Sequence, residues 1–148
     1  MTILNYQTIL VAVDGSTEAN YALDKAIYLA KEDDAQLIIC FVLDNRSTGT
    51  IAISDHSYVE HAKQYGNSLL NECQEKAVQA GLTNVKSVLE FGTPKITIAT
   101  EIAPKHNVEL IVAGATGLNA VERLIVGSVS ENIVRRAKCD VLIVRKRD

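Results

Sequence analysis

Residues 110–131 read LIVAGATGLNAVERLIVGSVSE, and this stretch decides the fold class. Its first four residues, Leu110 to Ala113, form an apolar run that is typical of a buried strand. A stretch with three glycines follows. Beyond it, Val129, Ile133 and Ala137 share one face of a helix. A strand, a glycine loop and a helix therefore come in succession.

The rest of the chain repeats this alternation of strands and helices. Strands are predicted at 8–13, 36–43, 85–91, 108–113 and 141–144, with helices from 16 or 17 to 32, over 54–80, from Thr93-Pro94 onward, and after residue 127. The apolar stripe of the 54–80 helix includes Tyr58 and Tyr65. Right-handed crossovers then give one α/β domain over residues 1–148, an open parallel sheet of order 3-2-1-4-5 with helices on both faces.

This strand order opens a crevice where the first and fourth strands leave the sheet in opposite directions. Asp14 follows the first strand and Gly114 follows the fourth. We therefore expect two segments that are distant in sequence to line one cleft.

Composition limits the kinds of partner that the protein binds. The chain has 148 residues, 47 % hydrophobic and 22 % charged, which suffices for a core without a metal or a disulfide. A net charge of −3 argues against nonspecific nucleic-acid binding. No secretory leader and no apolar run of membrane-spanning length is present, so we expect a cytoplasmic protein with reduced cysteines.

Glycines and serines after the fourth strand suggest an anion site. Gly114, Gly117, Gly127 and Ser128 fit the spacing G-x-x-G-x9-G-S, and Ser128 is a candidate N-cap with Glu131 at capping-box distance. Each glycine alone could simply permit a turn, and the serine could simply cap a helix. Together, at the crevice and near a helix N-terminus, they favour a phosphate cradle. No P-loop lysine motif and no G-x-G-x-x-G motif is present, which argues against a fast NTPase and a hydride-transfer enzyme.

The chain resembles the universal stress proteins of the UspA superfamily. The resemblance rests on TILVAVDGS at 8–16, VELIVAG at 108–114 and GSVSENIVRRAKCDVLIVRK at 127–146, and it covers essentially the whole chain. The glycine motif is similar to that of the nucleotide-binding branch. This resemblance implies a Rossmann-like fold that binds ATP, with Mg²⁺ or Mn²⁺ on the phosphates.

The resemblance also implies roles for individual residues. Asp14 would accept a hydrogen bond from the ribose or lie near the phosphates through a metal, and Val42 would lie by the adenine. Gly114 and Gly117 would approach the ribose and phosphates. The full expected nucleotide set is Asp14, Val42, Gly114, Thr116, Gly117, Gly127, Ser128, Val129 and Ser130. Thr116 and Leu118 stand where relatives often carry basic or imidazole residues. At these two positions the sequence departs from the family's pattern for contacts to the terminal phosphate.

Two simpler interpretations and three functional ones stay open. Asp14 could form an Asx-turn and no more, and His56, His61 and His106 are expected on the surface because no metal-ligand or catalytic spacing joins them. We see no general base placed to activate water, so the main hypothesis is an ATP-binding regulatory stress-response protein.

The alternatives are a slow ATPase or phosphotransferase, and a dimer whose cleft holds no nucleotide. The resemblance implies a homodimer through Val141–Val144, and it leaves any other protein partner unknown.

Overall fold

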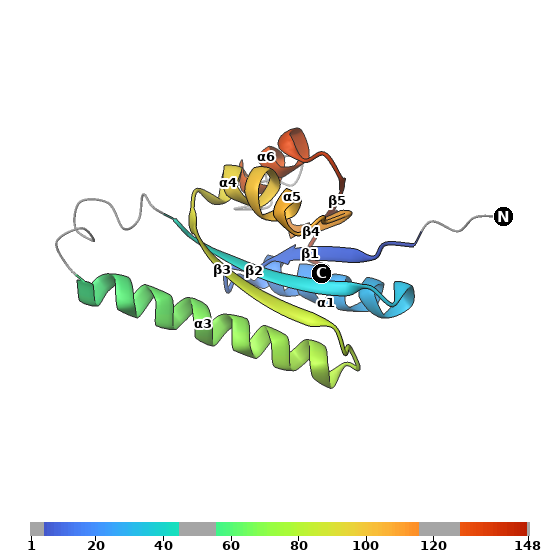
Figure 1. Ribbon diagram of the computed structural model, residues 1–148, viewed down its shortest axis with the longest axis horizontal. Helices are drawn as coiled ribbons and strands as arrows, with labels where there is room; N and C mark the ends of the chain where they lie inside the picture. Colours follow the sequence, from blue (N-terminus) through green and yellow to red (C-terminus); the bar gives the residue numbers. More distant parts are fainter. Residues whose placement is uncertain (1–4, 45–55, 116–127, 148) are drawn as a thin grey trace.

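A computed structural model describes residues 5–44, 56–115 and 128–147, and its centre is a parallel sheet (Figure 1). The strands are β1 (Thr8–Ala12), β2 (Gln36–Asp44), β3 (Val85–Gly92), β4 (Leu110–Gly114) and β5 (Asp140–Val144). They lie in the order β3-β2-β1-β4-β5, and all neighbouring pairs are parallel. The predicted five-stranded sheet and its order are confirmed.

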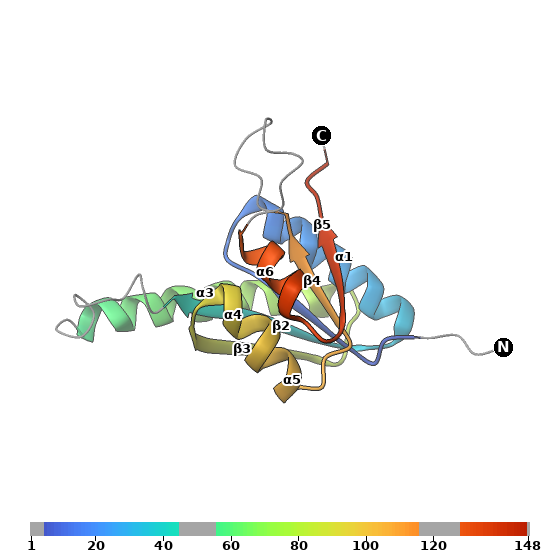
Figure 2. The same ribbon diagram turned by 90° about the horizontal axis from the view of Figure 1, so that it is seen from above.

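Helices cover both faces of the sheet (Figure 2). One face carries α1 (Thr17–Asp33) and α3 (His56–Gln79); the other carries α4 (Pro94–Thr97), η1 (Ile98–Ile102), α5 (Ala103–Lys105) and α6 (Ser128–Arg136). Neighbouring β1 residues point to opposite faces, so Ile9 packs with α1 and α3 while Leu10 packs with the other group. Both are fully buried, as a strand covered on two sides requires. Among the described residues, no helix is long and apolar enough to cross a membrane.

The first helix, α1, begins and ends at residues suited to those positions. Ser16 is its N-cap, and the Ala19 N–H donates to Ser16 Oγ at 3.1 Å. Its buried face is built mainly from alanine, which lets the helix lie close to the sheet. Asp34 stops the helix in the left-handed conformation, with φ of 53°.

The long helix α3 differs from its predicted packing. Cys73 and Ala77 are buried as the predicted stripe requires, and Leu70, which the prediction left out, is buried as well. Tyr58, however, is 41 % exposed and Tyr65 is 55 % exposed. Figure 1 shows that the first turns of α3 extend past the end of the sheet, and Tyr65, farther along the helix, meets the sheet only edge to face at Phe41. The prediction that these two tyrosines belong to the buried stripe was therefore wrong.

The helical segment after β3 contains a wide turn. Pro104 has no N–H to donate, as the sequence indicated, and the disturbance begins earlier in the chain. The Ala103 N–H bonds to the Ile98 carbonyl, five residues back, and makes η1 a π-helical turn. Asn107 then reverses the chain with φ of 56°, and the Val108 N–H bonds to the Ala103 carbonyl at 2.9 Å. Consequently β4 begins at Leu110, two residues later than predicted.

Candidate functional site

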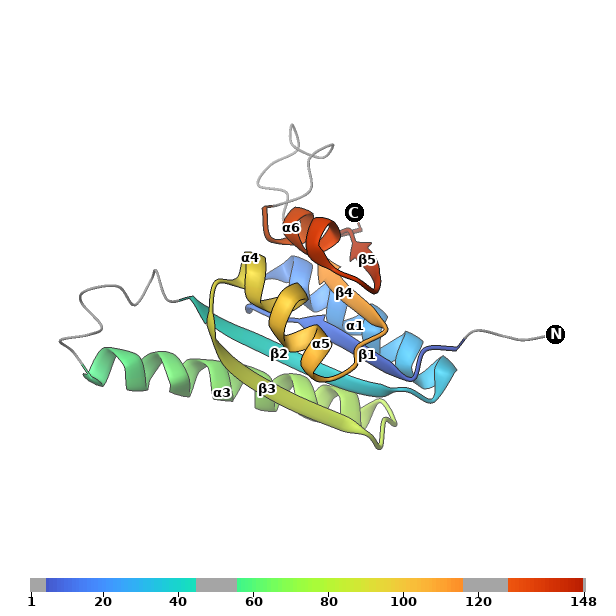
Figure 3. The same ribbon diagram turned by 45° about the horizontal axis from the view of Figure 1, so that its top comes forward.

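The structure contains a cavity at the carboxyl ends of β1 and β4, where the switch in strand order was predicted to open one. Its volume is about 130 Å³. A single water needs roughly 10–15 Å³, so this cavity has room for part of an organic ligand. It is lined by Ala12, Val13, Asp14, Ser16, Ala19, Cys40, Val42, Pro94, Ile98, Ala113, Gly114, Val129, Ser130 and Ile133. Figure 3 shows α4 and α6 side by side over this end of the sheet.

Most of the described residues that the sequence placed in the site border this cavity. They are Asp14, Val42, Gly114, Val129 and Ser130. Ser128 is exposed and is not among the lining residues. The predictions for Thr116, Gly117 and Gly127, like the departure at Leu118, fall outside the described residues.

Asp14 lies in a tight turn between β1 and α1. The Ser16 N–H donates to Asp14 Oδ1 at 2.9 Å, and Gly15 between them has φ of 86°. The simpler interpretation of this aspartate, an Asx-type turn, is thus part of the structure. Asp14 is nevertheless exposed and lines the cavity, and among the described residues its Oδ2 has no hydrogen bond. One carboxylate oxygen holds the turn and the other is available to a ligand.

Position 114 requires glycine for a packing reason that the sequence interpretation missed. A Cβ atom at this position would lie 2.6 Å from the Glu18 carbonyl oxygen and 3.1 Å from the Ala19 nitrogen. Both atoms belong to the backbone of the first turn of α1, so they cannot rotate away. Gly114 therefore lets α1 start directly beside β4, in addition to bordering the cavity.

The start of α6 differs by one residue from the expected cap. The described helix includes Ser128 itself, so this serine is not its N-cap, and the preceding residue falls outside the described residues. Glu131 does not reach back along the capping box; its Oε1 accepts from Arg135 at 2.9 Å. Ser130 is 1 % exposed and lines the cavity together with Val129, so the first turn of α6 closes one side of the site.

The sequence interpretation missed several lining residues, and two of them had a usable signal. Cys40 is two residues before Val42 on β2, and side chains two apart share a face of a strand. Thr93-Pro94 predicts a helix start, and the confirmed strand order places that start beside the end of β2. Ile98 follows one turn later and completes an apolar group with Cys40, Val42 and Pro94.

The charge of the described lining is low. None of the lining residues is basic, and Asp14 carries a carboxylate. Burial, with a smaller effect of Glu90, raises the pKa of the Cys40 thiol to about 12, so this thiol stays neutral. Among the described residues, an anionic ligand would therefore meet backbone N–H groups and no cationic side chain.

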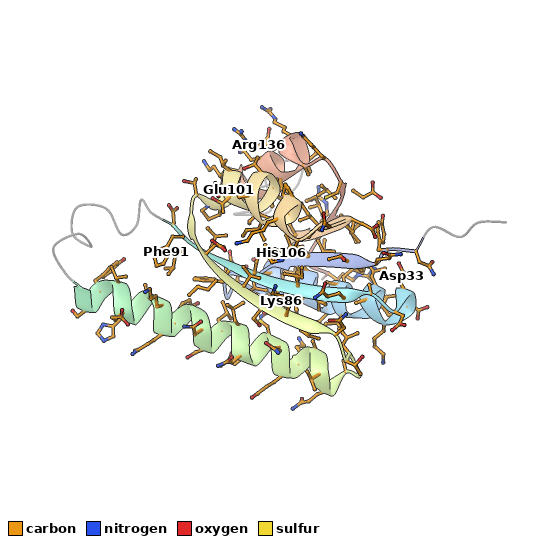
Figure 4. All side chains as sticks on the ribbon, viewed as in Figure 1. Asp33, Lys86, Phe91, Glu101, His106 and Arg136 are labelled. Atoms are coloured by element: carbon orange, nitrogen blue, oxygen red, sulfur yellow. The ribbon has the colours of Figure 1, made fainter. Side chains whose placement is uncertain are left out.

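His106 lies apart from this cavity. Within 5–44, 56–115 and 128–147, no group of three or more His, Cys, Asp or Glu side chains could hold a metal ion. His106 precedes β4 and so lies at the opposite end of that strand from the cavity; Figure 4 shows it near Lys86. Burial, followed by the charges of Lys86 and Lys105, holds the pKa of His106 below its usual value. His106 thus belongs to a separate surface of the protein.

Comparison with known proteins identifies the family. The model of the universal stress protein family matches residues 5–145. A protein of Staphylococcus haemolyticus that bears the universal stress protein name is 48 % identical over 146 residues, covering 99 % of this chain and 88 % of its own. The solved UspA structure from Lactobacillus plantarum has a TM-score of 0.85 at 30 % identity, covering 97 % of this chain and 100 % of its own. A universal stress protein solved in complex with cAMP has a TM-score of 0.71 at 32 % identity, covering 96 % and 98 % of the two chains. On this sequence and structural similarity, the chain belongs to the universal stress protein family.

Proposed function

We propose that this protein, as a single cytoplasmic domain, binds an adenine nucleotide, ATP with Mg²⁺ or Mn²⁺, in the cavity at the ends of β1 and β4. The observation that carries the proposal is the combination of an apolar slot, an available carboxylate oxygen and the first turn of a helix around one space. A base, a sugar and a phosphate chain need these three kinds of surface. The similar universal stress protein solved with cAMP supports an adenine nucleotide as the ligand class.

The lining residues divide into three groups along the proposed nucleotide. The base would lie in the apolar group around Val42, Pro94 and Ile98. Asp14 would accept from the ribose or face the metal. The first turn of α6, with the Ser130 hydroxyl, would meet the phosphates, and the sequence adds Thr116, Gly117, Gly127 and Ser128 to that end.

A divalent cation fits the charges of this site. Asp14 and a triphosphate would repel each other in a cavity whose described lining has no basic side chain. Mg²⁺ is usually held by one or two carboxylates together with substrate phosphates, and Asp14 Oδ2 would be one such ligand. The cation would supply the charge balance between the carboxylate and the phosphates.

We propose binding and regulation in the stress response, with catalysis at most slow. Asp14 is the ionisable carboxylate on the described lining, and its other oxygen accepts from the Ser16 N–H. The oxygen that accepts from Ser16 holds the turn, so it is not free to take a proton from an attacking water. Single-turnover hydrolysis measurements on the metal-loaded protein separate this proposal from a slow ATPase or phosphotransferase.

We further propose a homodimer through β5. This strand is at one end of the sheet, and Val141, Leu142, Ile143 and Val144 are only partly buried. An apolar strand at an edge favours antiparallel pairing with a second copy. Sedimentation over a range of protein concentrations would show a two-chain species, and a monomer throughout would refute this part.

The test of nucleotide binding uses the isosteric variant Asp14→Asn. An asparagine oxygen can still accept from the Ser16 N–H, so the turn is kept while the charge is removed. We expect Mg²⁺-ATP affinity to fall by about 10- to 100-fold, as for the loss of a charge-assisted contact. Asp24→Asn is the matched control, because Asp24 is on the surface of α1 and pairs with Lys76 at 2.6 Å.

Calorimetry with ATP, ADP and cAMP gives these affinities, and mass analysis of small molecules released on denaturation identifies any ligand carried from the cell. A wild-type protein that releases no nucleotide and gives no binding heat with any of the three would refute the proposal. It would leave the nucleotide-free protein-interaction dimer as the better interpretation.

A further inference from the structure

Helix α3 reaches the Asp14 turn through one exposed aromatic side chain. A Cβ atom built on Gly15 would lie 2.5 Å from the Tyr65 hydroxyl oxygen and 3.8 Å from its Cζ. The hydroxyl end of Tyr65 is therefore in contact with the backbone at Gly15. Tyr65 comes from the opposite face of the sheet from α4 and α6, and it reaches the turn from outside the cavity.

The position of the Tyr65 ring is set by the sheet beneath it. The ring meets Phe41 of β2 edge to face, with centroids 5.9 Å apart and planes at 66°. The next residue, Gly66, lets α3 approach closely, since a Cβ there would lie 2.8 Å from Phe41 and 2.9 Å from Leu89. Glycine inside a helix is about 1 kcal/mol less favourable than alanine. The close packing of α3 on the sheet therefore comes with a less stable helix.

Among the described residues, two hydrogen bonds that involve side chains hold the turn that Tyr65 touches. The Ser16 N–H bonds to Asp14 Oδ1, and Ser16 Oγ accepts from the Ala19 N–H. Gly15 lies between these two points with φ of 86°, and both Asp14 and Gly15 are exposed. A glycine in an exposed turn has many alternative conformations. Contact with a fixed aromatic ring removes the conformations in which Gly15 moves outward.

We propose that Tyr65 is a positioning residue for the Asp14–Gly15–Ser16 turn, and that it thereby couples the position of α3 to ligand affinity at the cavity. An exposure of 55 % means that the tyrosine contributes little to the core, while its hydroxyl end lies against the one glycine of this turn. Movement of α3 away from Phe41 would withdraw this support and free the Asp14 carboxylate to turn away from the cavity.

The affinity part of this inference rests on the proposed nucleotide function, and the turn itself can be tested without any ligand. In Tyr65→Ala we expect exchange of the Ser16 amide hydrogen with water, measured by NMR, to rise about fivefold, as for one residue regaining part of its backbone freedom. The buried Val112 amide should be unchanged. Affinity for Mg²⁺-ATP should fall by about fivefold as well. Tyr65→Phe keeps the ring on Phe41 and should lie between the two proteins in both measurements.

Tyr28→Ala is the matched control, because Tyr28 is 58 % exposed and lies near the far end of α1. It should change neither measurement. Equal Ser16 exchange in Tyr65→Ala and the wild type would overturn the inference, and so would an equal rise at Val112, which would indicate general destabilisation. If the wild type binds no nucleotide, the proposed function fails, whereas the exchange measurements still decide the role of Tyr65.

Discussion

Replacing Gly114 with alanine tests whether α1 and β4 depend on direct backbone contact. The added methyl group would lie 2.6 Å from the Glu18 carbonyl oxygen and 2.7 Å from the Glu18 carbonyl carbon. These atoms must move by several tenths of an ångström, and α1 with its Ser16 cap must move with them. Overpacking of this kind typically costs about 1–3 kcal/mol.

A second effect acts in the opposite direction. Gly114 does not have a positive φ, so alanine can adopt its backbone conformation and gains about 0.4–1 kcal/mol from a less flexible unfolded chain. The net loss should be about 1–2 kcal/mol, or roughly 2–8 °C in melting temperature for a domain of this size. Urea unfolding followed by circular dichroism measures the free energy directly.

Gly66→Ala is the control for this experiment. Its new methyl group would meet side-chain atoms of Phe41 and Leu89, which can rotate, and alanine is favoured in a helix by about 1 kcal/mol. We expect a result closer to neutral. If Gly114→Ala unfolds at the same urea concentration as the wild type, backbone contact between α1 and β4 is not what requires glycine at this position.

Three further perturbations address the sheet, the thiols and the helix cap. The Tyr6 hydroxyl donates to Asp140 Oδ2 at 2.6 Å, and Tyr6→Phe should cost about 0.5–1.5 kcal/mol in chemical unfolding. This hydrogen bond, followed by burial, raises the pKa of Tyr6 to about 12. The bond therefore stabilises the fold fully below pH 10, and this stabilisation is lost as the pH rises towards 12. A tyrosinate titration with an ordinary midpoint would contradict this. Cys139, which is half-buried, should be alkylated first, and the fully buried Cys40 last. Mass spectrometry of timed samples measures the two rates, and equal rates would mean that the cavity opens readily. Ser16→Ala should cost about 1 kcal/mol by removing the N-cap of α1, and an unchanged melting temperature would refute this role.

The sheet was predictable because its signals are local and consistent. Continuous apolar runs predicted strands covered on both faces, and helices between them predicted parallel crossovers. The exposure of Tyr58 and Tyr65 was not predictable in this way, because the helical stripe of α3 is periodic along its whole length. Where the sheet ends beneath α3, and how Tyr65 meets Phe41, are settled only in three dimensions.

The location of the candidate site could be predicted from the sequence, but the structural reasons for some of its residues could not. The spacing of Asp14 and Gly114 after the first and fourth strands placed both at one cavity. The contact between Gly114 and Glu18 could not be seen, since a glycine in a sequence does not reveal which backbone approaches it. The sequence leaves an Asx-turn at Asp14 open as an alternative to ligand binding, and in the structure the turn uses only one of the two carboxylate oxygens.

The strand order also has a consequence for the nascent chain on the ribosome. Leu10 of β1 pairs with Ile38 on one side and with Ile111 on the other, and these partners are made at very different times. At ordinary translation rates the second partner follows the first strand by roughly 5–20 seconds. During this interval the central strand has an unpaired apolar edge, which invites association with other chains. Transcripts truncated before residue 108 should therefore yield aggregated products or products bound to chaperones.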